Sequence, residues 1–127
     1  INGRSMTPAR WPNEGLAPMD DSMPLEDRII DAGEDWTPTN KTGKGGSFRV
    51  DFDRLKHWTK AEDMLLDGLV ANDWSWQSHL IASMDGEQKT LTLQDPAPYT
   101  IKMTPRFYIE NLLQEIDMPG EYFIDRQ

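Results

Sequence analysis

Tryptophan is the residue type in this sequence that is best suited to ligand binding, because the flat indole face stacks well on a sugar ring. The chain has five tryptophans among 127 residues. Four of them are candidates for a carbohydrate-binding surface: Trp36, Trp58, Trp74 and Trp76. Trp74 and Trp76 lie two residues apart on one face of a predicted strand, so we expect this pair to pack in the core. Trp36 lies in a polar loop beside a proline and is the better candidate for an exposed platform.

Catalytic groups are not singled out by the sequence. With 22 acidic residues in the chain, a pair of carboxylates at a suitable spacing for acid–base catalysis is expected by chance. Asp51 and Asp53 share a strand face by spacing, but a solvated pair is the default interpretation. No Gly-x-Ser-x-Gly motif surrounds a serine, and residues 41–46 lack the residue order of a phosphate-binding loop. We therefore predict no catalytic residue in this segment.

Metal and cofactor chemistry has little support. The chain has no cysteine, which excludes disulfides, thiolate zinc sites and a cysteine nucleophile. Its two histidines, His57 and His79, are too few for a histidine-rich metal site, and we expect His79 to face solvent. Acidic residues at 20–21 and 31–35 supply the oxygen ligands that calcium prefers, but without EF-hand spacing. We predict no cofactor and no metal, with calcium at these acidic loops as the open alternative.

Charge and composition narrow the partners. A formal net charge of −9 argues against nucleic acid, whose phosphates require a basic surface. It also argues against anionic membrane surfaces, and no apolar run approaches the roughly 20 residues that would span a bilayer. An acidic surface is compatible with neutral partners such as oligo- or polysaccharides. Nine prolines and nine glycines favour many turns over long helices.

A hairpin within residues 69–94 is the strongest structural signal. Two runs with period-two alternation are separated by an Asp-Gly pair, Asp85-Gly86. This dipeptide is typical of tight hairpin turns with positive φ at both central positions. The alternation places Trp74 and Trp76 on one face of the first run, and Leu91 and Leu93 on one face of the second.

The remaining pattern predicts short strands and two short helices. Strands are expected at 47–52, 99–103 and 121–126, and helices at 59–66, ended by Gly68, and at 111–116. A turn or short helix is expected at 54–58, and a strand or single helical turn at 25–30. Residues 20–47 are expected to form an irregular acidic and glycine-rich loop region. The fold class is therefore all-β: a small antiparallel β-barrel or sandwich with one or two short helices, as a single domain over 1–127.

Two segments resemble a known family. Residues 2–15 (NGRSMTPARWPNEG) and 107–127 (FYIENLLQEIDMPGEYFIDRQ) resemble segments of secreted right-handed parallel β-helix carbohydrate-active proteins, which include glycoside hydrolases and polysaccharide lyase-like proteins. In that family the two segments flank an inserted, mostly antiparallel β-domain. The resemblance implies that this chain is such an insert, a fragment of a larger β-helix protein whose catalytic carboxylates lie on the β-helix coils.

The resemblance also implies a function. The domain would be a non-catalytic accessory module of a bacterial glycan-processing protein, secreted, periplasmic or at the cell surface. It would buttress the β-helix or wall the glycan cleft, with the rest of the parent chain as its partner and residues 1–10 and 118–127 paired as neighbouring strands. The alternatives are an autonomous carbohydrate-binding module and a structural assembly domain. Solvent-facing tryptophans would favour binding, and buried tryptophans would favour a scaffold.

Overall fold

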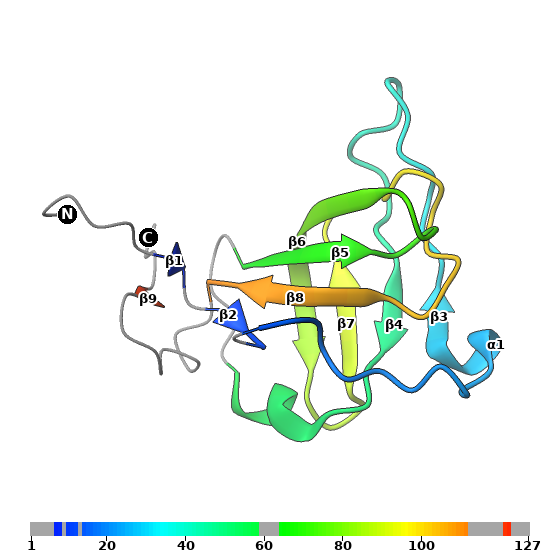
Figure 1. Ribbon diagram of the computed structural model, residues 1–127. Coiled ribbons are helices and arrows are strands. Elements are labelled where there is room, and N and C mark those ends of the chain that lie inside the picture. The colour runs from blue at the N-terminus through cyan, green and yellow to red at the C-terminus, as the bar shows by residue number, and fades with distance from the viewer. Residues whose placement is uncertain (1–6, 9, 13, 59–63, 112–120, 123–127) are drawn as a thin grey trace, which may run out of the picture.

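The chain folds mainly into β-structure, as expected for the all-β class. The computed structural model describes residues 7–8, 10–12, 14–58, 64–111 and 121–122. These residues form a seven-stranded sheet in the order β2-β8-β5-β6-β7-β4-β3, and β1 pairs separately with β9 (Figure 1). The elements are β1 (Thr7–Pro8), β2 (Arg10–Trp11), α1 (Leu25–Arg28), β3 (Ile29–Asp31), β4 (Ser47–Arg49), the 3-10 helix η1 (Asp53–His57), β5 (Leu65–Leu69), β6 (Trp76–Asp85), β7 (Thr90–Leu93), β8 (Arg106–Glu110) and β9 (Glu121–Tyr122).

The long strand β6 joins the two halves of the sheet. Its first half pairs with β5, from Leu69↔Trp76 to Leu65↔Leu80, and its second half pairs with β7. The register shifts between Ile81 and Ser83, and such irregularities bend a strand and increase its twist. Figure 1 shows the result, in which β5 and β8 cross in front of β6, β7 and β4. The curved sheet therefore encloses one core in the manner of a small sandwich or barrel.

The core lies between these two halves. Phe107 on β8 contacts Phe48 on β4 edge to face, with ring centroids 5.6 Å apart, and both side chains are 0% exposed. Leu91 and Leu93 are buried as the alternation predicted. The expected strand at 47–52 is confirmed for Ser47–Arg49, and its apolar positions are all buried: Phe48, Val50 and Phe52.

The hairpin is confirmed, but its turn differs from the prediction. Asp85 pairs with Thr90, so four residues rather than two form the turn. Asp85 Oδ1 accepts hydrogen bonds from the main-chain N–H groups of Glu87 and Gln88, each at 3.0 Å. Lys89, and not Gly86, has a positive φ, of 55°. Gly86 is instead required by a close approach, since a β-carbon there would lie 2.7 Å from the Cα of Lys56.

The conformation of Lys89 leads to a prediction. A left-handed backbone strains a residue with a β-carbon by about 1 kcal/mol, so Lys89→Gly should raise the free energy of unfolding by up to about 1 kcal/mol, less the small contribution of the exposed ion pair between Lys89 and Asp53. Urea denaturation would measure this change. Gln88→Gly is the matched control and should lower stability, because Gln88 in the same turn has no positive φ. Equal destabilisation by both variants would show that the left-handed backbone at Lys89 is not strained.

The predicted helix at 59–66 is wrong over its described end. Met64 to Leu66 do not continue a helix, and Leu65–Leu69 form β5, which lies between β6 and β8. Gly68 is a strand residue in close contact with the main chain of the paired strand β8, and it is not a helix cap. The local capping signals are overridden because Leu66 is fully buried in the core and β5 hydrogen-bonds on both sides. Residues 59–63 lie outside the described part.

The other expectations have mixed outcomes. The segments at 54–58 and 25–30 form η1 and the α1–β3 pair. The strand at 99–103 is wrong, because Tyr99 and Thr100 have positive φ values of 69° and 62°, which no strand tolerates. Asn111 has φ 66° and is not helical, and 112–116 lie outside the described residues. At the ends, Thr7 pairs with Glu121 and Pro8 with Tyr122, in parallel; the rest of the 121–126 strand is not described.

The acidic region 20–47 is organised around a buried arginine. Arg28 is 0% exposed and pairs with Asp51 at 2.6 Å. It also donates to the carbonyl oxygens of Arg49 (2.7 Å) and Asp20 (2.9 Å). The segment is thus tied to β4 rather than solvated as an open loop. Within the described ranges, no helix is long and apolar enough to cross a membrane.

Candidate functional site

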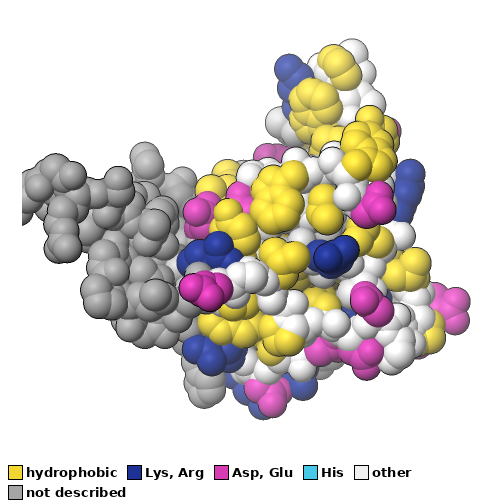
Figure 2. All heavy atoms as spheres, viewed as in Figure 1, with side chains coloured by type: hydrophobic (Ala, Val, Ile, Leu, Met, Phe, Trp, Pro, Cys, Tyr) yellow, Lys and Arg dark blue, Asp and Glu magenta, His cyan; other side chains and the backbone are white. Residues whose placement is uncertain are grey.

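The tryptophans divide between surface and core in a different way from the prediction. Trp74 is 69% exposed and Trp76 is 53% exposed, so the expectation that this pair packs in the core is wrong. The inward-facing residues of β6 are Gln77 and Ile81, which places the alternate positions outside. Trp36 is exposed as expected, at 39%. Figure 2 shows hydrophobic side chains gathered over β5, β6 and β8 and on the projecting loop.

Trp58 was predicted as a carbohydrate-binding residue, but the structure shows that its side chain is buried. Its side chain is 7% exposed and packs against Phe52 and Trp11, with ring centroids 5.8 and 5.5 Å apart. All three rings belong to the core or lie against it. Trp58 therefore stabilises the domain and is not accessible as a sugar platform.

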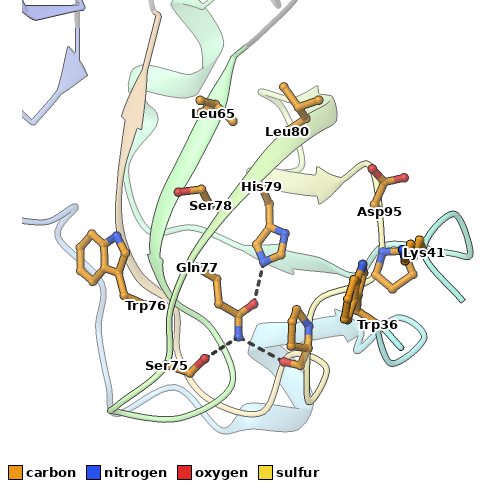
Figure 3. A pocket seen from close by; sticks show the side chains of 12 residues that line it. Trp36, Lys41, Leu65, Ser75, Trp76, Gln77, Ser78, His79, Leu80 and Asp95 are labelled. Atoms are coloured by element: carbon orange, nitrogen blue, oxygen red, sulfur yellow. Dashed lines mark hydrogen bonds between the residues drawn. The ribbon is translucent and has the colours of Figure 1, made fainter. Parts of the chain in front are cut away.

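An open groove of about 530 Å³ runs between β6 and the loop that carries Trp36. Figure 3 shows Trp36 and Lys41 on one wall, facing Gln77 and His79 on the other. Trp76 also borders the groove, but its side chain points to the other side of β6 (Figure 3). The groove is thus lined by one indole and several polar groups, with a second indole outside its rim.

The loop that carries Trp36 is held by hydrogen bonds at its base. The main-chain N–H of Trp36 donates to Ala97 at 3.3 Å. Glu34 accepts from the main-chain N–H of Lys44 at 2.9 Å and from Asn40 Nδ2 at 3.1 Å, and these bonds lower the pKa of Glu34. The loop stands out from the sheet (Figure 1), yet the position of Trp36 is fixed without help from a ligand.

The opposite wall is built on a buried amide. Gln77 is 8% exposed, and its Nε2 donates to the carbonyl oxygen of Pro98 (3.1 Å) and to Ser75 Oγ (3.3 Å). Because this fixes the amide orientation, Gln77 Oε1 is the acceptor for His79 Nε2–H at 2.7 Å. The three bonds lock the wall in one arrangement (Figure 3).

His79 is half-buried rather than solvent-facing as expected. Burial lowers its pKa, and the neighbouring carboxylates of Asp95 and Asp67 oppose this effect. The ring is therefore neutral at pH 7 and carries its proton on Nε2, which leaves Nδ1 as a hydrogen-bond acceptor. Gln77 and His79 are the site residues that the sequence analysis missed. They alternate with Trp76 and Ser78, so correct assignment of the strand faces would have identified them.

The main chain of β6 supplies further polar groups. The N–H of Ile81 donates toward β5, to Met64 (3.0 Å), whereas the carbonyl of Leu80 accepts from Gln94 on the other side (2.9 Å). Because alternate residues of an antiparallel strand point to opposite neighbours, the N–H and C=O groups of Trp76 and Ser78 point away from β5. They face the groove, where no neighbouring strand of the described sheet pairs with this half of β6.

Lys41 supplies the positive charge of the groove. Its Nζ lies 5.9 Å from the centre of the Trp36 ring, within the range of a cation–π interaction. Asp95 is a carboxylate on the same groove. The groove therefore offers both a hydrogen-bond donor and acceptors to a neutral polar ligand, with no large excess of either charge.

The acidic residues considered for catalysis or calcium binding have structural partners. Asp51 pairs with Arg28, and Asp53 pairs with Lys89 at 2.9 Å. Asp20 Oδ1 accepts from Ser22, which lowers the pKa of Asp20, and Asp31 pairs with Lys44. Among the residues that the structure describes, no three histidine, aspartate or glutamate side chains are grouped to hold a metal ion.

Comparisons with protein-family models, with curated proteins and with solved structures find no match to this chain. The fold and the groove define the class to which the chain belongs, a small β-domain with a preformed, aromatic-lined polar groove.

Proposed function

We propose that this domain is a non-catalytic carbohydrate-binding module that holds a glycan chain in the groove against Trp36. The observation that carries the proposal is an exposed indole fixed opposite a wall of oriented hydrogen-bonding groups. The indole face packs on the apolar face of a sugar ring, while Gln77, His79 and the edge of β6 face its hydroxyls. A volume of about 530 Å³ lies in the usual range of ligand sites.

The open shape of the groove favours a chain over a single sugar. A glycan that leaves the Trp36 side can cross the rim of β6 and reach Trp76, whose ring lies 6.0 Å from that of Tyr108 on the outer face. Two platforms separated by a strand edge suit successive sugar units. Neutral glycans are the preferred ligand class, since the chain carries a net charge of −9 and the groove has one lysine opposed by Asp95.

The wider context that we propose is an exported glycan-processing protein. Two observations support it: the resemblance of residues 2–15 and 107–127 to the flanks of a β-helix insert, and the parallel pairing of β1 with β9. That pairing brings the two flanking segments side by side, as an inserted domain requires. In such a protein the module would wall the glycan cleft and present the groove to the substrate held by the parent chain.

A glycan array with the 127-residue chain, followed by titration of the best ligand, tests this proposal. Trp36→Ala should weaken binding about tenfold or more, since about 1.4 kcal/mol of stacking is lost. Trp74→Ala is the matched control: Trp74 is more exposed but does not border the groove, so binding should change less than about twofold. No glycan bound, or equal losses in the two variants with the fold intact, would refute the proposal.

A further inference from the structure

Two carboxyl groups, those of Asp67 and Glu110, meet on the outer face of the sheet, on the side of β6 to which Trp76 points. Asp67 on β5 is 6% exposed, and its Oδ1 accepts a hydrogen bond from Ser78 Oγ on β6. Its Oδ2 is buried and meets no N–H or hydroxyl donor among the described residues. Tyr108 is the cross-strand partner of Asp67, and Glu110 lies two residues further along β8 on the same face. Its carboxyl group is within hydrogen-bonding reach of Asp67.

Two carboxylates cannot hydrogen-bond to each other unless one carries a proton. The hydrogen bond between these two carboxyl groups therefore forms only when Glu110 is protonated. Burial, followed by the hydrogen bond to Asp67 and its negative charge, raises the pKa of Glu110 from 4.5 to about 7. Glu110 therefore takes up and releases its proton near neutral pH.

Charged and titratable groups on β2, β6 and β8 surround the Asp67–Glu110 pair. From β2, Arg10 lies over the Tyr108 ring, 3.7 Å from its centre, and its guanidinium donates to Pro12 and Gly15 carbonyls. Arg10 lowers the pKa of Glu110, but by less than the other causes raise it. From β8, burial raises the pKa of Tyr108. From β6, Ser78 faces Asp67, and the field of Asp67 also reaches His79.

We propose that the Asp67–Glu110 pair is a proton-controlled switch for the Trp76 side of the binding groove. This proposal rests on the proposed function, because the switch would regulate glycan binding in the groove. While Glu110 is protonated, it hydrogen-bonds to Asp67, Asp67 keeps the hydrogen bond from Ser78, and Trp76 packs beside Tyr108, the cross-strand partner of Asp67. When that proton leaves, the two carboxylates repel, the hydrogen bond between them is lost, and Glu110 turns toward solvent. Trp76 then loses the ordered surface beside it, and glycan binding weakens.

The first part of the test needs no ligand. Carboxyl ¹³C NMR should give a titration midpoint for Glu110 near 7 in the intact chain, and the Trp76 indole N–H signal should shift with the same midpoint. In Glu110→Gln the indole shift should vanish, and in Asp67→Asn the Glu110 midpoint should fall. Glu87→Gln, in the hairpin turn, is the control that should change neither. A Glu110 midpoint near 4.5, or an indole signal that does not follow it, would overturn the switch.

The second part uses the best glycan from the array. Affinity at about pH 5.5 should exceed affinity at about pH 8.5 by fivefold or more, and Glu110→Gln should remove the difference. Glycan binding that is equal at both pH values would overturn the switch and leave the proposed function standing. No binding at either pH would overturn the proposed function, and the NMR titration would then decide alone whether the pair responds to protons as described.

Discussion

Replacing Gly68 with valine is expected to unfold the domain, and replacing it with alanine to lower the free energy of unfolding by about 3 kcal/mol. Gly68 lies in β5, where it is paired with Phe107 of the neighbouring strand β8. A β-carbon there would overlap the carbonyl oxygen of Arg106 and lie 2.7 Å from the Cα of Phe107. Both obstacles are main-chain atoms of a paired strand, so neither can rotate away. Urea denaturation of the alanine variant measures the loss.

Gly15→Ala is the matched control for this effect. Gly15 has φ +71°, but a β-carbon there would meet nothing within 4 Å. The cost is then the left-handed backbone alone, about 1 kcal/mol. If Gly68→Ala is no more destabilising than Gly15→Ala, the close approach of the β8 main chain to Gly68 does not limit this position.

Arg28→Met is expected to lower the free energy of unfolding by about 3 kcal/mol. The guanidinium is fully buried and satisfies two carbonyl oxygens and the Asp51 carboxylate at once. Methionine fills much of the volume but removes the guanidinium hydrogen bonds to all three acceptors. Asp51 keeps the N–H of Asp20 at 2.6 Å and is 23% exposed, which limits the loss. Thermal and urea denaturation would both show it.

Arg49→Met separates this network from a general effect of losing an arginine. Arg49 is on the same sheet half but exposed, and its Nε donates to the carbonyl of Asp27 at 3.0 Å. Its loss should cost less than about 1 kcal/mol. Equal losses for the two arginines would show that the buried hydrogen bonds of Arg28 do not anchor the 20–31 segment.

The parts of the fold that the sequence predicted are those set by local alternation. Phe48, Val50 and Phe52, and Leu91 and Leu93, are apolar at every second position with polar residues between, so their buried face follows from the strand period alone. The first strand of the hairpin carries apolar residues on both faces. Trp76 and Leu80 alternate with Ile81, and only the packing of the other strands decides which face is buried. The prediction chose the wrong one.

The prediction for the residues of β5 was wrong for a related reason. Its sequence Leu65-Leu66-Asp67-Gly68-Leu69 has no alternation, and its glycine locally favours the end of a helix. A strand paired on both sides takes its conformation from its neighbours. One of those neighbours, β8, lies far along the chain, so no local pattern contains the full information.

Of the candidate site, the sequence predicted only the exposure of Trp36, which depends on the local context of a single residue. Trp36 stands in a polar, proline-containing loop and is exposed, as its context indicated. The groove itself is assembled from that loop, from β6 and from the segment around Pro98, which contact one another only in the folded chain. The Asp67–Glu110 pair is likewise a product of strand register, since its members are 43 residues apart in sequence (110 − 67).

The unpaired half of β6 has a consequence for association between molecules. Main-chain groups that face outward from a strand edge are a template for another strand, and proteins protect such edges with loops, charges and prolines. Here the loop carrying Trp36 and Lys41, with Pro96 and Pro98 beneath it, stands across the edge at Trp76 and Ser78. The same loop that shapes the groove thus also shields the sheet from growing by intermolecular pairing, and shortening it would expose the edge of β6.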